Sequence, residues 1–203
     1  MPEPGPGPSL SDLGRNQAEE AAEHIRVWRA GLPPVSALYS SPLNRARETA
    51  AIIGQALDLS VVENPTLVDC NAGEWAGVPL SQLARKPEWA TVQHYPSGFR
   101  FPGGESIPEM SARMVGSVKA LAHAHPGQGV VIVSHADPIK AVLAEALGTH
   151  LDLFQRIVVS PASVSAISYS ETGPNVVLTN WTGPSGQGPA KSGPGSTAAR
   201  NRP

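Results

Sequence analysis

The strongest constraint on the fold of this chain is an apolar strand that passes directly into an amphipathic helix. Residues 35–39 are mostly apolar, and Ser41 and Pro42 follow them, residue types that favour the cap and the first turn of a helix. Apolar residues then recur every three or four positions as far as Leu57. The pattern predicts a helix over residues 42–57 that buries one face against the rest of the domain.

The same pattern occurs again later in the chain. Residues 130–133 form an unbroken aliphatic run, which is typical of a strand buried on both faces of a sheet. The run ends in Ser134 and His135, and Asp137 and Pro138 then predict the cap and first position of a second helix. Two strand–helix units of this kind indicate an α/β domain with parallel strands.

Two polar residues follow these strands at the edge where ligands usually bind in open α/β sheets. Arg45 lies in the first turn of the first helix, and His135 lies at the end of the second strand. The amino terminus of a helix attracts anions, and a guanidinium binds phosphate oxygens well. The pattern therefore indicates a phosphate site at Arg45, with His135 placed at a similar strand end beside a second helix terminus.

Five blocks of this sequence, in order, resemble the histidine phosphatase superfamily, and most closely its phosphoglycerate mutase-like branch. The blocks are residues 10–18, 40–50, 67–77, 101–106 and 131–135. The resemblance implies a three-layer α/β/α fold with a central, mostly parallel sheet. It also divides the chain into a Pro/Gly-rich segment at 1–9, a phosphatase domain at 10–182 and a tail at 183–203. Twelve of the twenty-one residues in that tail are Gly, Pro or Ser, so we expect it to be disordered.

The resemblance assigns roles to several residues. Arg45 would bind the phosphate, and His135 would be the second, protonated histidine that stabilises the transferring phosphoryl group. Asp69 stands where the family places its proton donor, usually a glutamate, and Glu74 is near enough in sequence to compete for that role. Glu105 is either a charge at a helix start or a pocket residue. The implied reaction is hydrolysis of a phosphomonoester through a phosphohistidine, with neither a metal nor another cofactor.

One part of the family pattern is absent from this sequence. The family carries its nucleophilic histidine in an Arg-His-Gly triplet at the end of the first strand, and the sequence contains no such triplet. Residues 1–9 are too rich in Pro and Gly to form a central strand. We therefore expect the first, central strand to be missing from between the strand ending at Tyr39 and the one ending at Ser134. The cause that we favour is a gene start assigned too far downstream.

Three functions remain open at this point. A longer chain that restores the triplet would be a phosphomonoesterase, whereas the chain as it stands is expected to be inactive or strongly impaired, since loss of a nucleophile costs several orders of magnitude in rate. A second option is a relative that binds phosphorylated ligands through Arg45 and His135 without turnover. The third is a truncated fragment with no function of its own. In the first two cases the partner is a small phosphorylated compound.

Composition limits the partners and the cellular location that we expect for this chain. The net charge of −2 and the pI near 6.3 give no basic surface for nucleic acid or anionic membranes. No apolar run is long enough to span a bilayer, and the single cysteine, Cys70, rules out an internal disulfide. We expect a cytoplasmic protein whose oligomeric state is open, with a dimer among the options. His123 and His125 lie at a helix end with no third ligand at a suitable spacing, so no metal site is predicted there.

Overall fold

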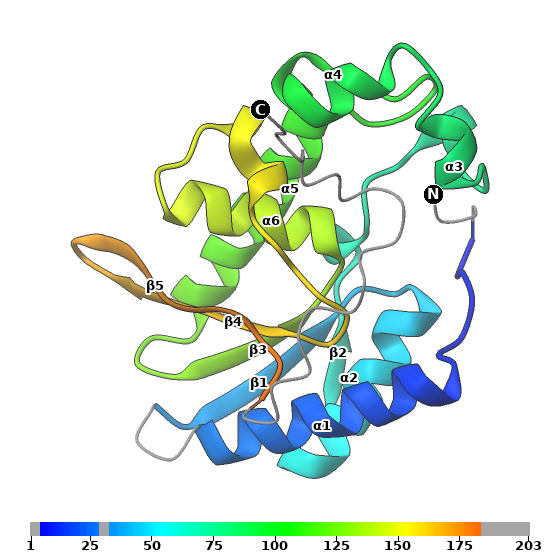
Figure 1. Cartoon of the computed structure of the whole chain (residues 1–203). Coiled ribbons are helices and arrows are strands. Elements are labelled where there is room, and N and C mark those ends of the chain that lie inside the picture. Colours follow the sequence, from blue (N-terminus) through cyan, green and yellow to red (C-terminus); the bar gives the residue numbers. More distant parts are fainter. Residues whose placement is uncertain (1–4, 29–32, 184–203) are drawn as a thin grey trace, which may run out of the picture.

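The computed structural model describes residues 5–28 and 33–183, so the predictions for residues 1–4 and 184–203 lie outside the described part. Within it, a parallel sheet lies between two helical layers, and an antiparallel hairpin lies beside that sheet (Figure 1). This is the three-layer α/β/α architecture predicted from the sequence.

The parallel sheet contains β1 (Val35–Ser40), β2 (Val61–Glu63) and β3 (Gly129–Val133) in the order β2-β1-β3. β1 is the central strand and pairs with a parallel neighbour on each side. In the register of β1 and β3, Ser40 lies opposite Val133. Both strands therefore deliver the residues that follow them to the same edge of the sheet.

Four long helices form the two outer layers. α1 (Asp12–Trp28) and α2 (Asn44–Leu57) cover one face of the sheet, and α5 (Ile107–Ala124) and α6 (Ala136–Ala146) cover the other (Figure 1). The apolar stripe of α2 is buried as its spacing predicts, through Ala46, Ala50, Ile53 and Leu57.

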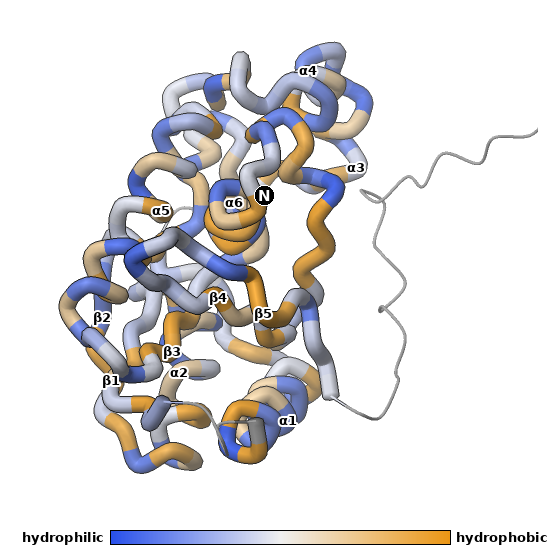
Figure 2. Tube along the Cα trace, turned by 90° about the vertical axis from the view of Figure 1, so that its left-hand side faces the viewer, coloured by the Kyte–Doolittle hydropathy of each residue, from blue (hydrophilic) through white to orange (hydrophobic). Residues whose placement is uncertain are grey.

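Successive side chains of β3 point to opposite faces of the sheet. Val131 and Val133 pack into the cluster formed with α1 and α2, whereas Ile132 packs into the cluster on the side of α5 and α6. Apolar residues therefore cover both faces of this strand, which explains its unbroken aliphatic sequence. Figure 2 accordingly colours much of β3 as hydrophobic.

The remaining strands form a separate antiparallel sheet. β4 (Val164–Ser170) pairs with β5 (Gly173–Trp181), and neither strand pairs with β3 among the residues that the structure describes. Ile167 of β4 packs against the same apolar cluster as Ile132 of β3. β3 and β4 therefore lie over the same helices without being hydrogen-bonded to each other.

The position predicted for the missing strand is wrong. We expected a strand between those ending at Tyr39 and Ser134, but β1 and β3 are hydrogen-bonded to each other directly. β3 and β4 instead contribute to the same apolar cluster. In the described part of the chain, each of them also has an edge with no partner strand. All five residues of β3 are partly exposed, whereas Leu38 and Ser40 of the doubly paired β1 are fully buried. Over the described residues, β3 is therefore an aliphatic strand that has one unpaired edge and is only partly buried.

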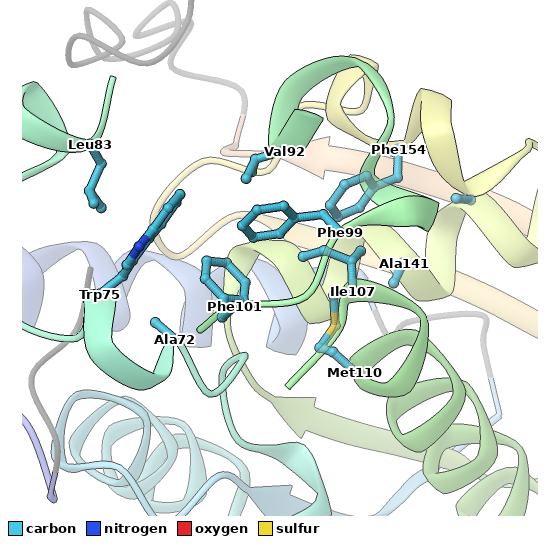
Figure 3. Packing of buried hydrophobic residues seen from close by; sticks show 11 residues of the cluster. Ala72, Trp75, Leu83, Val92, Phe99, Phe101, Ile107, Met110, Ala141 and Phe154 are labelled. Carbon is cyan, nitrogen blue, oxygen red and sulfur yellow. The ribbon is translucent and has the colours of Figure 1, made fainter. Parts of the chain in front are cut away.

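The segment between β2 and α5 forms a cap whose apolar core is shared with residues of α5 and α6. Its elements are short turns of helix: η1 (Pro65–Leu67), η2 (Gly73–Trp75), α3 (Leu80–Leu83), α4 (Trp89–His94) and η3 (Pro96–Gly98). Trp75 packs against Phe99 and Phe101, with ring centroids 5.4 and 5.6 Å away (Figure 3). The ring of Trp89 stacks on it at 6.4 Å. A later turn, η4 (Leu151–Arg156), adds Phe154 to this core.

α2 begins two residues later than predicted. Its first helical residue is Asn44, and Leu43 at the cap position makes no side-chain cap. Ser41 is therefore not the helix cap, although its Oγ accepts a hydrogen bond from the amide of Leu43 at 3.3 Å. The amide of Asn44 donates to the carbonyl of Pro6 at 2.7 Å, and its side chain donates to the carbonyl of Gly7 at 2.9 Å.

The start of α5 provides a test of the fold. Ser106 Oγ accepts a hydrogen bond from the amide of Glu109, and the Glu109 carboxylate accepts one from the amide of Ser106. Ser106→Ala should lower the free energy of unfolding, measured by urea denaturation, by about 1 kcal/mol. Ser111→Ala in the same helix is the control and should lower it much less. Equal losses in the two variants would contradict the capping role.

Candidate active site

The candidate site forms where β1 and β3 end side by side. The amide of Ser41, directly after β1, donates to the carbonyl of Val133 at the end of β3 over 2.9 Å. This pairing leaves the Ser41 Oγ 2.8 Å from Nε2 of His135. α6 begins at Ala136 with His135 at its cap position, so Asp137 is not the cap predicted from the sequence.

Arg45 and His135 meet at one carboxylate oxygen. Nη2 of Arg45 lies 3.0 Å from Oδ2 of Asp69, and Nδ1 of His135 lies 3.8 Å from the same oxygen. The three residues come from the first turn of α2, the loop after η1 and the end of β3. Gly7 lies against this group, since a Cβ there would be 3.0 Å from Nη1 of Arg45. The structure thus brings together the three residues to which the sequence gives catalytic or phosphate-binding roles.

The loop that carries Asp69 is tied to the end of β3. The Ser134 Oγ donates to the carbonyl of Leu67 at 2.8 Å. Burial and the nearby charge of Asp137 raise the pKa of Asp69, and together they outweigh the lowering effect of Arg45. A carboxyl group whose pKa is raised keeps its proton to higher pH, as a proton donor requires.

The pKa of His135 is shifted in the opposite direction. Burial, helped by the positive charges of Arg45 and Arg113, lowers this pKa to about 3, and the side chain is 5% exposed. The imidazole is therefore neutral at pH 7 in this arrangement, unlike the protonated histidine that the resemblance implies. A phosphate dianion between Arg45 and His135 would favour the imidazolium, because it would offset the charge of the guanidinium.

The two other predicted glutamates lie in different surroundings. Glu105 forms a bidentate ion pair with Arg113 and lines a cavity of about 370 Å³ together with Asp69. Glu74 is exposed on η2, where its side chain lies beside Gly103. Glu105 thus belongs to a cavity wall beside the site, while the pocket role of Glu74 stays a prediction.

Two residues of this region gave no functional signal in the sequence. Ser41 has the type and position of a helix cap, yet its hydroxyl lies against His135. Arg113 precedes Met114 of the buried stripe of α5, and a helical pattern shows only that it lies off that stripe. Its pairing with Glu105 spans the start of the helix, and such a contact depends on the path of the chain before the helix begins.

Two kinds of feature are absent from residues 5–28 and 33–183. In those ranges, no three His, Cys, Asp or Glu side chains gather closely enough to hold a metal ion. No helix in the same ranges has the length and apolar character needed to cross a membrane.

Known sequences include relatives of this chain. The family described as the histidine phosphatase superfamily (branch 1) matches residues 3–182. The chain is 31% identical over 176 residues to phosphoserine phosphatase 1 of Hydrogenobacter thermophilus, covering 84% of this chain and 79% of that protein. It is 33% identical over 178 residues to a bifunctional protein of Mycobacterium tuberculosis, of which it spans only 48%.

A solved structure has the same fold. The mycobacterial glucosyl-3-phosphoglycerate phosphatase complexed with VO3 superimposes with a TM-score of 0.76. The two chains are 26% identical, and the match covers 89% of this chain and 90% of the other. The arrangement of helices around the parallel sheet is therefore that of a known phosphatase.

The protonation of His135 can be tested by nuclear magnetic resonance. The imidazole of His135 should show no titration between about pH 8 and about pH 5, since burial favours its neutral form. Arg45→Ala should raise the pKa of His135, because it removes a neighbouring cation, but burial should keep that pKa below its ordinary value. Arg47→Ala is the control, since Arg47 is exposed on the same helix and pairs with Glu63. Titration of His135 near pH 6.5 in the unaltered protein would contradict this account.

Proposed function

The chain belongs to the histidine phosphatase superfamily, and from that premise we propose that it is the phosphate-binding and proton-donating part of a metal-independent phosphomonoesterase. The observation that carries the proposal is the meeting of Arg45 and His135 at Oδ2 of Asp69. A phosphoryl group bound there would face a guanidinium and an imidazole near the amino ends of α2 and α6, where anions are favoured.

Each of the three residues has a distinct role in the proposed reaction. Arg45 binds the equatorial oxygens of the phosphoryl group and stabilises the charge on them in the transition state. His135 takes up a proton when the dianion is near and then donates a hydrogen bond to the same group. Asp69, with its raised pKa, protonates the oxygen of the departing alcohol and later accepts a proton from the attacking water.

A further segment supplies the nucleophile in this proposal. Of the six histidines in the sequence, His135 is the one that contacts Asp69 in the described residues. Three of the other histidines contact different residues: His24 lies against Trp181, His125 against Tyr39 and His150 against Asp152. The thiol of Cys70 is a poor substitute, since burial and the charge of Glu105 raise its pKa and keep it protonated.

The unpaired edges of β3 and β4 support a place for that segment. Both strands pack on one apolar cluster, yet each is paired on one side alone in the described part of the chain. An added strand could satisfy the free backbone groups of both edges and cover the partly exposed residues of β3. If it ran parallel to β3, it would end at the same edge as Ser134 and place its last residues beside the site.

The relatives guide the choice of substrate class. One is named a phosphoserine phosphatase and another a glucosyl-3-phosphoglycerate phosphatase. By analogy, this chain acts on or binds a small phosphomonoester. The meeting of Arg45, Asp69 and His135 at one point also favours a second candidate function. In that case the chain is a relative that binds such compounds without turnover.

Anion binding tests the site itself. Calorimetry with inorganic phosphate and with vanadate should show binding, and Arg45→Ala should weaken it at least tenfold, since a hydrogen bond to a charged group contributes about 1.5–3 kcal/mol. Arg47→Ala should bind both anions as the unaltered chain does. A chain whose near-UV circular dichroism shows fixed tertiary structure but which binds neither anion would contradict the proposal. Absence of that signal would favour the truncated fragment.

Phosphate release from an aryl phosphate tests the missing nucleophile. We expect little release by this chain and a gain of several orders of magnitude when an amino-terminal extension adds a strand ending in Arg-His-Gly. His135→Ala in the extended protein should remove most of that gain. Turnover by the unextended chain would overturn the assignment of the missing histidine, and binding without turnover in either form would favour the non-catalytic relative.

A further inference from the structure

Arg113 of α5 holds the loop that carries Asp69 by its backbone. Its Nη1 donates to the carbonyl of Thr66 at 2.6 Å and to that of Val68 at 3.1 Å. Its Nη2 lies 3.4 Å from the carbonyl of Asp69 itself. One guanidinium thus contacts three carbonyls in the four residues that end at Asp69.

Glu105 completes this arrangement from the other side of the loop. Its carboxylate accepts hydrogen bonds from Nε and Nη2 of Arg113 at 2.9 and 2.8 Å, and its Oε2 also accepts one from the amide of Asn71 at 3.3 Å. The amide of Glu105 in turn donates to the carbonyl of Asn71 at 2.9 Å. The backbone is therefore fixed both before and after Asp69.

Glycine permits this close approach. A Cβ at Gly104 would lie 2.4 Å from the carbonyl oxygen of Asn71, and a Cβ at Gly73 would lie 2.1 Å from the carbonyl oxygen of Pro102. Gly73 also has a positive φ of 52°. The sequence thus allows the segment that carries Glu105 to lie directly against the loop of Asp69.

The ion pair between Arg113 and Glu105 is largely shielded from solvent. The side chains of Arg113 and Glu105 are 22% and 16% exposed. The three nitrogens of the Arg113 guanidinium divide these contacts between backbone carbonyls and both oxygens of one carboxylate, a geometry that the planar fork of arginine provides and lysine does not. The contacts are therefore specific to arginine.

From these contacts, and resting on the function proposed above, we infer that Arg113 and Glu105 are a positioning pair that aims the carboxyl group of Asp69 at Arg45 and His135. Neither residue touches the reacting group in this account. Their part is to keep the loop still, so that the proton donor stays buried beside the phosphate site instead of swinging toward water.

Arg113→Lys tests this inference, since it keeps the charge and removes the fork. A loosened loop would let water reach Asp69, and burial is the largest cause of its raised pKa. The charged groups that act on this carboxyl are Asp137 and Arg45, and His135 also faces it, with Nδ1 3.8 Å from Oδ2; the variant alters none of these three residues. Nuclear magnetic resonance should therefore show the pKa of Asp69 falling from its raised position toward the ordinary value of an aspartate.

Two further variants make the result decisive. Glu105→Asp also keeps its charge but shortens the reach of the carboxylate, and it should lower the pKa of Asp69 in the same direction. Arg100→Lys is the matched control: Arg100 binds the carbonyl of Gly104 and the carboxylate of Glu109, and it contacts none of the carbonyls that Arg113 holds. An unchanged or increased pKa of Asp69 in both Arg113→Lys and Glu105→Asp would overturn the inference, and so would an equal fall in Arg100→Lys.

Phosphate binding by the unaltered chain separates this inference from the proposed function. If the unaltered chain binds phosphate and the pKa of Asp69 is the same in every variant, the positioning role fails and the phosphate site stands. If the unaltered chain binds no phosphate but Arg113→Lys lowers the pKa of Asp69, the pair does position the carboxyl group and the proposed function fails.

Discussion

The direct pairing of β1 with β3 determines where the chemistry of this molecule can occur. Because Ser40 lies opposite Val133, the next residues of both strands emerge together, and the amide of Ser41 binds the end of β3. That one register brings Arg45 and His135 to the same edge although they are ninety residues apart. A shift of the register by one residue would turn the side chains to the wrong faces and separate the site.

Burial, more than pairing, sets the protonation of the site. Asp69 has a cationic partner, yet its pKa is raised, and His135 lies near a carboxylate, yet its pKa is lowered. Both shifts favour the neutral form, as expected where water is largely excluded. Under the proposed function, an arriving phosphate dianion would meet one permanent cation, Arg45, and an imidazole that could become a second. The site would then gain charge as its ligand binds.

The sequence was most informative where one local pattern was sufficient. The two strand–helix units are present, since the apolar periodicity that predicts them acts over a few residues. The start predicted for α2 was wrong because the hydroxyl of Ser41, the expected cap, contacts His135 across the sheet edge. The short helices of the cap and the pairing of Arg113 with Glu105 depend on tertiary contacts, which spacing does not encode. The place predicted for a further strand was wrong for the same reason, since no single segment of the sequence specifies the strand order.

The contact of Asn44 with Pro6 and Gly7 has a practical consequence for work with this protein. The first turn of α2 holds the beginning of the described chain through a main-chain and a side-chain hydrogen bond, and Gly7 lies against Arg45. A purification tag or fusion partner joined at this terminus would therefore be connected to residues that contact α2 and lie against Arg45. A cleavable tag is the appropriate choice at that end.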